Sequence, residues 1–367
     1  MKSPVGTLNL GLADPLPARG CHSGFVRIPH STDRSAYGFV PLPIAIVGGR
    51  PGPTVLLISA LYGDEHDAQI AVARLMRELD PEKMTGRVIA VPMANAPAAR
   101  AGKRNSPIDG LNLNRSFPGD ILGSPTSIIA NYIERQLMTI SELVLDLHSD
   151  SSSFRYTPSA TVIYHEDLQI RARRYATALA FGAPTTRGFH SFEDRGTSGA
   201  ARRAGAVRIA TEMGGDDPIG MTVAGVTRIL KWAGIVDGNA DRSEPSRVQV
   251  VQQERDFVYT LNDGIFEPTF TLGQEVAAGD LAGRMVDVAR PFAQPAEILF
   301  PAAGTVVCTR SAGLAEAGDC VLHLASSATG AIEQEFGAAA QLRWLSTQAG
   351  DRPRSRRSVK TRRADGV

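Results

Sequence analysis

The sequence predicts an α/β protein with a mixed, largely parallel sheet flanked by helices, followed by a C-terminal all-β domain. Short apolar runs alternate with helix-period segments between about residues 54 and 235, which is typical of a largely parallel sheet. Beyond about residue 247, short strands punctuated by glycine and proline replace this alternation. With 367 residues, 43% of them hydrophobic, the chain is long enough for two domains with a core in each.

The elements of the α/β part follow from run length and periodicity. Apolar runs with the length of a buried strand lie at residues 54–60, 88–92, 143–147, 161–164 and 207–211. Segments whose apolar residues repeat at helical spacing lie at residues 67–79, 126–140 and 168–181. Because reactive groups in such sheets tend to follow the carboxyl ends of strands, we expect a site in the loops after these runs.

The composition shifts along the chain indicate four parts. We expect an N-terminal arm over residues 1–34, an α/β catalytic domain over 35–246, a β domain over 247–328 and a polar, basic tail over 329–367 that is disordered at its end.

The β domain contains two similar half-repeats. Residues 272–283 and 313–322 each place Ala-Gly-Asp before an apolar run, as the halves of a barrel-sandwich or lipoyl-like module do. A carrier module needs an exposed lysine for its cofactor, and residues 300–305 contain none. The sequence therefore favours a structural cap over a carrier.

Charge and cysteine content exclude several classes of function. The net charge is +1, but residues 351–367 carry seven Lys/Arg and two Asp/Glu, so the rest of the chain is acidic and no basic body predicts nucleic-acid binding. No run of about 18 apolar residues predicts a membrane span. Three cysteines without a CxxC pair fit a reducing compartment, so we expect a cytoplasmic protein.

Two strand ends and one helix start carry candidate groups for a metal-assisted hydrolysis. A catalytic zinc site needs about three ligands from His, Glu, Asp or Cys, together with a general base near the metal-bound water. Glu65 lies at the start of a predicted helix, His148 leaves the strand at 143–147, and Glu212 ends the strand at 207–211. Each of these residues taken singly is as readily structural as functional.

A loop rich in planar donors lies between these islands. Residues 104–119 contain Arg104, Asn114 and Arg115, whose side chains suit the recognition of a carboxylate or an oxyanion.

Taken together and in this order, the motifs resemble the succinylglutamate desuccinylase/aspartoacylase family within the zinc carboxypeptidase superfamily. The family pattern runs His-Gly-Asp-Glu, Asp-Gly-x-Asn/Asp-Leu-Asn-Arg-x-Phe-Pro-Gly, Asp-Leu-His and Glu-x-Gly-Gly, and its counterparts here are residues 62–65, 109–119, 146–148 and 212–215. Residues 100–110 and the stretch around 263–267 look most like the N-acetyl-diaminobutyrate deacetylases of ectoine breakdown. The resemblance spans roughly residues 40–326 and implies a zinc-carboxypeptidase-like fold.

The resemblance implies a role for each matching residue. Glu65 and His148 would bind one zinc ion, and Glu212 would be the general base. Arg104 would hold or polarise the acyl substrate. Asn114 and Arg115 would bind the substrate beside it, and Asp146 either orients His148 or is a buried structural residue.

Tyr62 stands where the family has its first histidine ligand. A phenol is a poorer zinc ligand than imidazole because it must first lose a proton. Three arrangements stay open. His66 reaches the metal, although adjacent helical residues point about 100° apart. Alternatively, Tyr62 joins Glu65 and His148 in a weak metal site, or the site holds no metal at all.

These observations predict a metal-dependent hydrolase that cleaves the amide bond of a small N-acyl amino acid or diamino acid. The alternative is a metal-free or metal-impaired relative that binds an acylated small molecule, because of Tyr62. Either reading requires a small acylated ligand, neither requires nucleic acid or a membrane, and both are compatible with a homo-oligomer.

Overall fold

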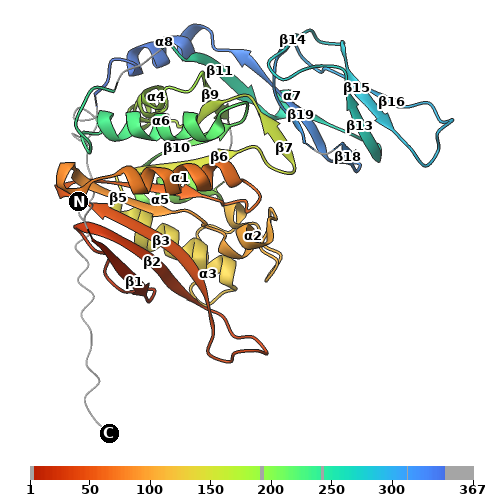
Figure 1. Cartoon of the computed structure of the whole chain (residues 1–367). Coiled ribbons are helices and arrows are strands. Elements are labelled where there is room, and N and C mark those ends of the chain that lie inside the picture. The colour runs from red at the N-terminus through yellow and green to blue at the C-terminus, as the bar shows by residue number, and fades with distance from the viewer. Residues whose placement is uncertain (1–3, 191–193, 241–243, 312, 344–367) are drawn as a thin grey trace.

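A large twisted sheet with helices on both faces forms the body of the molecule (Figure 1). The computed structural model describes residues 4–190, 194–240, 244–311 and 313–343. Within these ranges the sheet has 15 strands, and 13 of them follow the order β1-β2-β3-β5-β4-β6-β10-β8-β9-β11-β19-β17-β14. The predicted α/β fold with a C-terminal β region is therefore confirmed.

The middle of the sheet carries the five strands that the sequence predicts and one further strand, at residues 185–190, that it does not predict. It consists of β4 (Arg50–Ser59), β5 (Thr85–Val91), β6 (Leu143–Ser149), β8 (Ser159–Ile163), β9 (Thr185–His190) and β10 (Val207–Met213). Strand β6 is parallel to both neighbours, β4 and β10, and all seven of its residues are buried. Its apolar residues pack against both helical layers, which explains why the run at 143–147 is continuous rather than alternating.

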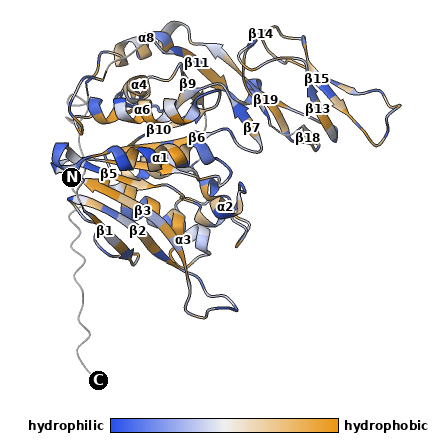
Figure 2. Cartoon of the chain, viewed as in Figure 1, coloured by the Kyte–Doolittle hydropathy of each residue, from blue (hydrophilic) through white to orange (hydrophobic). Residues whose placement is uncertain are grey.

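Helices cover the two faces of the sheet. One face carries α1 (His66–Glu78), α4 (Leu168–Phe181), α6 (Pro218–Trp232) and α8 (Gly330–Ala339). The other carries α2 (Ala96–Ala101), α3 (Pro125–Tyr132) and α5 (Thr197–Ala204), with a π turn (Ile133–Leu137) and a 3-10 turn (Met138–Ile140) after α3. Figure 2 shows hydrophobic residues gathered on the central strands and on the helix faces towards them. None of the helices within the described ranges is long and apolar enough to cross a membrane.

Residues 1–34, expected as an arm, form strands instead. The strands β1 (Val5–Leu10) and β2 (Gly20–Pro29) extend the sheet, and β2 pairs with β3 (Phe39–Gly48) over ten residues. Because β1 and β2 lie at the edge of the sheet, most of their side chains stay partly exposed. The apolar run that would have identified them is therefore missing.

The sheet continues from the α/β part into the β part. The strand β11 (Arg247–Gln252) pairs with β9 on one side and with β19 (Cys320–Ser327) on the other. Beyond β19 lie β17 (Gly304–Arg310) and β14 (Glu275–Val276), while β12 (Phe257–Tyr259) pairs with β19 and β7 (Phe154–Tyr156) with β17. The boundary placed at 246/247 thus falls within a continuous sheet.

The β part has its own core and a second sheet. Its strands are β16 (Ala296–Leu299), β15 (Leu281–Val286), β13 (Gly264–Pro268) and β18 (Leu314–Ala315), preceded in the chain by the short α7 (Gln253–Asp256). The expected tail begins with α8, where the rings of Phe336 and Tyr175 stack with centroids 3.7 Å apart. The basic residues 351–363 lie outside the described residues.

His323 of β19 is a buried, neutral histidine that packs against aromatic residues of β12 and β7. Its ring stacks on Phe257 with centroids 3.7 Å apart and lies near Phe154 of β7. Burial lowers its pKa to about 3. Since the folded pKa lies below the ordinary value of 6.5, the unfolded chain binds the additional proton, and the stabilisation is present above pH 6.5 and lost as the pH falls towards 3.

We therefore expect the free energy of unfolding to fall by about 2 kcal/mol between pH 6.5 and pH 5 through His323 alone. Urea unfolding of the wild type at the two pH values measures the total loss. His323→Phe keeps an aromatic ring but has no group to titrate, so its loss should be smaller by this amount. Parallel losses in the two proteins would contradict the prediction.

Candidate active site

The loop between β4 and α1 presents the first site residues. It is tied to the following strand connection by backbone hydrogen bonds from Ala94 to Ser59 and from Asn95 to Ala60, each 2.9 Å long. Gly63 is required here, because a Cβ at this position would lie 2.1 Å from the backbone of Ala98 in α2. The loop is buried throughout, so its position is fixed by packing.

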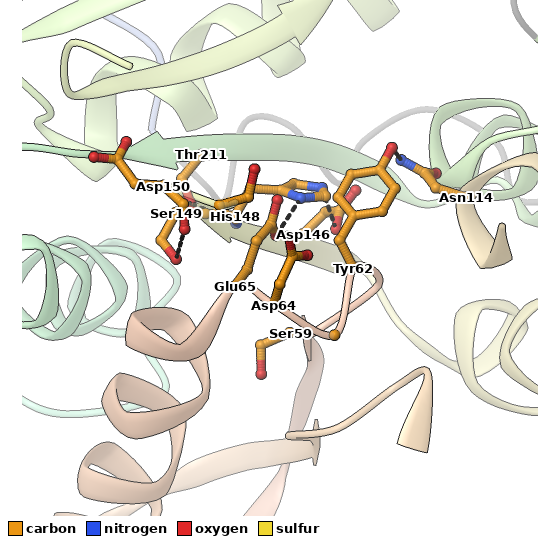
Figure 3. Close-up of polar contacts among 12 residues, drawn as sticks. Ser59, Tyr62, Asp64, Glu65, Asn114, Asp146, His148, Ser149, Asp150 and Thr211 are labelled. Atoms are coloured by element: carbon orange, nitrogen blue, oxygen red, sulfur yellow. Dashed lines mark hydrogen bonds and ion pairs between the residues drawn. The ribbon is translucent and has the colours of Figure 1, made fainter. Parts of the chain in front are cut away.

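His148 lies at the end of β6 between two carboxylates (Figure 3). Its Nδ1 is 2.8 Å from Oε2 of Glu65, and its Nε2 is 3.1 Å from Oδ1 of Asp146. Asp146 and His148 face the same side of β6 because they are two residues apart on one strand. Both ring nitrogens of His148 are therefore engaged by acidic groups.

The charges of this group are strongly coupled. Burial alone would lower the pKa of His148, but the carboxylates of Asp146 and Glu65 outweigh it and raise that pKa well above its ordinary value. Burial opposes the ionisation of Asp146, yet His148 and Arg208 lower its pKa. Burial also raises the pKa of Glu65, an effect that the charge of His148 opposes.

Glu212 stands beside this group on the neighbouring strand. Strands β10 and β6 are parallel and in register, with Glu212 opposite His148 and Ala210 opposite Asp146. Glu212 therefore shares the sheet face of His148, and its side chain is partly exposed. The surrounding protein raises its pKa to about 8, since burial and the charges of Glu65 and Asp146 outweigh the opposing effect of His148.

Tyr62 connects the loop after β4 to the donor-rich loop. Its ring lies beside that of His148, with centroids 5.3 Å apart, and the guanidinium of Arg104 lies over it, 3.6 Å from the centroid. The amide nitrogen of Asn114 donates to the Tyr62 hydroxyl at 3.3 Å. Figure 3 shows this hydroxyl directed at Asn114 rather than at the Glu65–His148 pair.

The 3-10 turn Leu113–Arg115 places Asn114 and Arg115 differently. Leu113 is buried in the core and anchors the turn. The oxygen of the Asn114 side chain accepts from the backbone of Thr197 at the start of α5, which fixes the amide. Arg115 is exposed, and its guanidinium donates to the backbone carbonyl of Asn114.

The structure thus brings most of the expected residues together and leaves two, His66 and the exposed Arg115, outside the group. Tyr62, Glu65, His148, Arg104 and Asn114 form one connected group, and Glu212 adjoins it. His66 is exposed as the first residue of α1, while Glu65 before it is buried. The structure therefore does not place His66 beside His148, for the geometric reason that neighbouring helical side chains diverge.

Supporting residues that the motifs did not indicate surround Asp146 and Asp64. Arg208 forms an ion pair with Asp146, and the hydroxyl of Thr197 donates to the same carboxylate at 2.5 Å. Asp64 accepts from the backbone and hydroxyl of Ser152, so it fixes the loop after β6. Alternation along β10 offered a signal for Arg208, because it shares a face with Glu212 four residues later.

The donor set does not match a three-ligand zinc site. Glu65 Oε2 and His148 Nδ1 are one good pair of ligands, but no group of three His, Cys, Asp or Glu residues suited to a metal occurs in the described part of the chain. The Tyr62 hydroxyl, at the position of the missing ligand, is bonded to Asn114. A structural or catalytic zinc centre needs about three protein ligands, and the residues that the structure describes offer two at this site, Glu65 and His148.

Comparison with known proteins shows which family the chain resembles over most of its length. Residues 51–230 match the succinylglutamate desuccinylase/aspartoacylase catalytic domain. The N-alpha-acetyl-L-2,4-diaminobutyric acid deacetylase of Halomonas elongata is 34% identical over 315 residues, which cover 84% of this chain and 92% of that protein.

Solved structures agree with this match. The product-bound ectoine utilization protein EutE (DoeB) of Ruegeria pomeroyi is 35% identical, with a TM-score of 0.82 and coverage of 86% of this chain and 98% of that one. A succinylglutamate desuccinylase/aspartoacylase of Rhodobacter sphaeroides is 32% identical, with a TM-score of 0.82 and coverage of 87% and 99%. The chain therefore belongs to the succinylglutamate desuccinylase/aspartoacylase family of hydrolases that act on acylated amino acids.

Proposed function

We propose that this protein removes the acyl group from a small N-acyl amino acid or N-acyl diamino acid. The observation that carries the proposal is the register of β6 and β10, which sets Glu212 beside the His148–Glu65 pair. Tyr62 in turn contacts His148, Arg104 and Asn114, so the donor-rich loop borders the same group. The name of the Halomonas relative, an N-alpha-acetyl-L-2,4-diaminobutyric acid deacetylase, supports an N-acetyl diamino acid as the substrate.

The residues divide by chemistry into a base and a set of donors. Glu212 is the candidate general base, because its carboxyl group is partly exposed and its pKa, raised to about 8, is near the working range of a base at neutral pH. Arg104 is the candidate donor to the acyl oxygen, where a charge develops as water attacks, and such a donor contributes roughly 3 kcal/mol. Asn114 and the exposed Arg115 suit the carboxylate of the amino acid.

The predicted metal dependence is supported by fewer residues than the proposed deacylation. A zinc ion would polarise the amide carbonyl and acidify its water, but the described residues supply two of the three ligands that such an ion needs. The roles proposed for Glu212, Arg104 and Asn114 therefore rest on these side chains alone.

A second candidate is an acyl-ligand binding protein with impaired hydrolysis. Two observations favour it: Tyr62 stands at a ligand position, and its hydroxyl is engaged by Asn114. In that case Arg104 and Asn114 would bind the acylated molecule while Glu212 turned it over slowly.

An assay of acetate release tests the proposal. The purified full chain is incubated with N-alpha-acetyl-L-2,4-diaminobutyric acid, with N-succinylglutamate as a second acyl donor, and with and without added zinc. Release of the acyl group with saturation kinetics supports the deacylase. Saturable binding without release at any zinc concentration supports the second candidate, and the absence of both would overturn both.

A further inference from the structure

Tyr62 makes three contacts that together show which part of the site it serves. Its side chain is 7% exposed, and its ring is enclosed between the ring of His148 and the guanidinium of Arg104. Its hydroxyl accepts the hydrogen bond from Asn114. Two of the three contacts are to the donor-rich loop, and both use polar or cationic groups.

The contact between the Tyr62 ring and the Arg104 guanidinium is a cation–π interaction that stabilises the position of both groups. A guanidinium stacked on a tyrosine ring contributes about 0.5–2 kcal/mol, more when it is shielded from water. Arg104 is half-buried, so the ring of Tyr62 both supports and orients its guanidinium. A histidine at position 62 would offer a smaller ring to Arg104 and no hydroxyl to Asn114.

The same contacts remove Tyr62 from metal coordination. To act as a ligand, the phenol oxygen would have to lose its proton and turn from Asn114 towards the Glu65–His148 pair. That rotation would carry the ring away from beneath Arg104. The two roles are therefore mutually exclusive in this geometry.

We infer that Tyr62 is a positioning residue for the substrate-binding groups Arg104 and Asn114, and that Glu65 and His148 are the two protein ligands left to a metal at this site among the described residues. The first half rests on the proposed function, because it assigns Arg104 and Asn114 to the acylated substrate. The second half concerns metal affinity and stands without any activity.

Zinc affinity tests the metal half directly. Calorimetric titration of the full chain with zinc is made on the wild type, Tyr62→Phe and Tyr62→His, with folding checked by circular dichroism. Tyr62→Phe should leave the zinc affinity within about twofold, because no metal–oxygen bond is lost. Tyr62→His should tighten it by at least about 100-fold, since even residues that only support metal ligands are worth 10–100-fold.

A matched control separates a repaired site from an added histidine. Phe292 is 99% exposed, so Phe292→His adds the same residue elsewhere on the surface and should leave zinc affinity unchanged. A loss of zinc affinity of more than tenfold in Tyr62→Phe would overturn the inference, since it would show that the phenol is a ligand. So would an equal gain in Tyr62→His and Phe292→His.

Substrate affinity tests the positioning half. For N-alpha-acetyl-L-2,4-diaminobutyric acid, KM, or Kd from calorimetry if turnover is absent, should rise about 3–10-fold in Tyr62→Phe, which loses the bond to Asn114. Tyr62→Leu also loses the stacking under Arg104, so its KM should rise about 10–100-fold. Its kcat should fall as well, because Arg104 is also the candidate donor to the charge that develops on the acyl oxygen. The kcat of Tyr62→Phe should stay within about threefold of the wild type.

The positioning role of Tyr62 and the number of metal ligands can be contradicted independently of each other. An unchanged KM in Tyr62→Leu would overturn the positioning role while leaving the zinc titrations to decide the ligand count. A protein that neither binds nor hydrolyses the acetylated probe would overturn the proposed function and the positioning role together, whereas the zinc result would keep its meaning.

Discussion

Replacing Glu212 with glutamine is expected to lower kcat for the acylated substrate by about 10²–10⁴-fold, the usual contribution of a general base. The structure gives the physical reason. Glu212 shares a sheet face with His148, its side chain is partly exposed, and burial raises its pKa to about 8. Glutamine keeps the shape of the side chain but cannot accept a proton from water.

The expected result has a kinetic form that a merely structural residue would not give. Because the lost interaction belongs to the transition state, kcat and kcat/KM should fall together while KM changes little. Glu267 offers a matched control, since it is an exposed glutamate on strand β13, and Glu267→Gln should leave both constants unchanged. A raised KM with an unchanged kcat in Glu212→Gln would contradict the assignment and indicate substrate binding instead.

Stability supplies an independent readout of the same substitution. A carboxyl group whose folded pKa is raised above its ordinary value destabilises the folded state as the pH rises through that interval. Glutamine carries no charge at any pH, so Glu212→Gln is expected to keep or increase the free energy of unfolding at pH 8. A loss of activity together with retained stability would separate a chemical role from a structural one.

Much of the fold could be read from the sequence because its signal is local. The runs at 143–147 and 207–211 are mostly apolar, interrupted by Asp146 and by Arg208, and both are buried strands of the sheet centre. Strand β2, which lies second from the edge of the sheet, escaped detection, because most of its side chains are partly exposed and it has no continuous apolar run. Its place in the sheet depends on pairing with β3, which is a non-local interaction.

The sequence indicated which residues are candidates for the site, but not the contacts between them. Strand ends and motif order indicated Glu65, His148 and Glu212, and the parallel register of β6 and β10 brings the last two together. The direction of the Tyr62 hydroxyl could not be predicted, because it depends on Asn114, which lies 52 residues further along the chain. The ion pair between Arg208 and Asp146 likewise arises only when β6 and β10 are placed side by side.

Replacing Arg187 with methionine is expected to lower the free energy of unfolding by about 3–5 kcal/mol, because it removes a charged donor from several buried acceptors. Arg187 lies on β9 with 2% of its surface exposed. It donates to the side chain of Gln249 at 3.2 Å, to the hydroxyl of Ser159 at 2.8 Å and to Thr157. Methionine has a similar length but leaves these buried acceptors without their donor.

The position of Arg187 explains why the effect should reach beyond β9. Ser159 is in register with Glu212 on β10, and Gln249 on β11 donates in turn to Thr305 on β17. One guanidinium thus joins β8, the neighbour of the strand that carries the candidate base, to β11, which continues into the β part of the sheet. Burial lowers the pKa of Arg187 to about 10, an effect that the charge of Glu212 partly offsets.

Urea unfolding of a small set of variants distinguishes this network from simple packing. Arg187→Lys keeps the charge but not the planar fork, so its loss should be smaller than that of Arg187→Met. Combining Arg187→Met with Gln249→Leu should cost less than the sum of the two single losses, because the same hydrogen bonds are removed twice. Arg155 on β7 is exposed, and Arg155→Met should stay within about 0.5 kcal/mol of the wild type. A loss below about 1 kcal/mol for Arg187→Met would show that Gln249 and Ser159 hold this junction without the guanidinium.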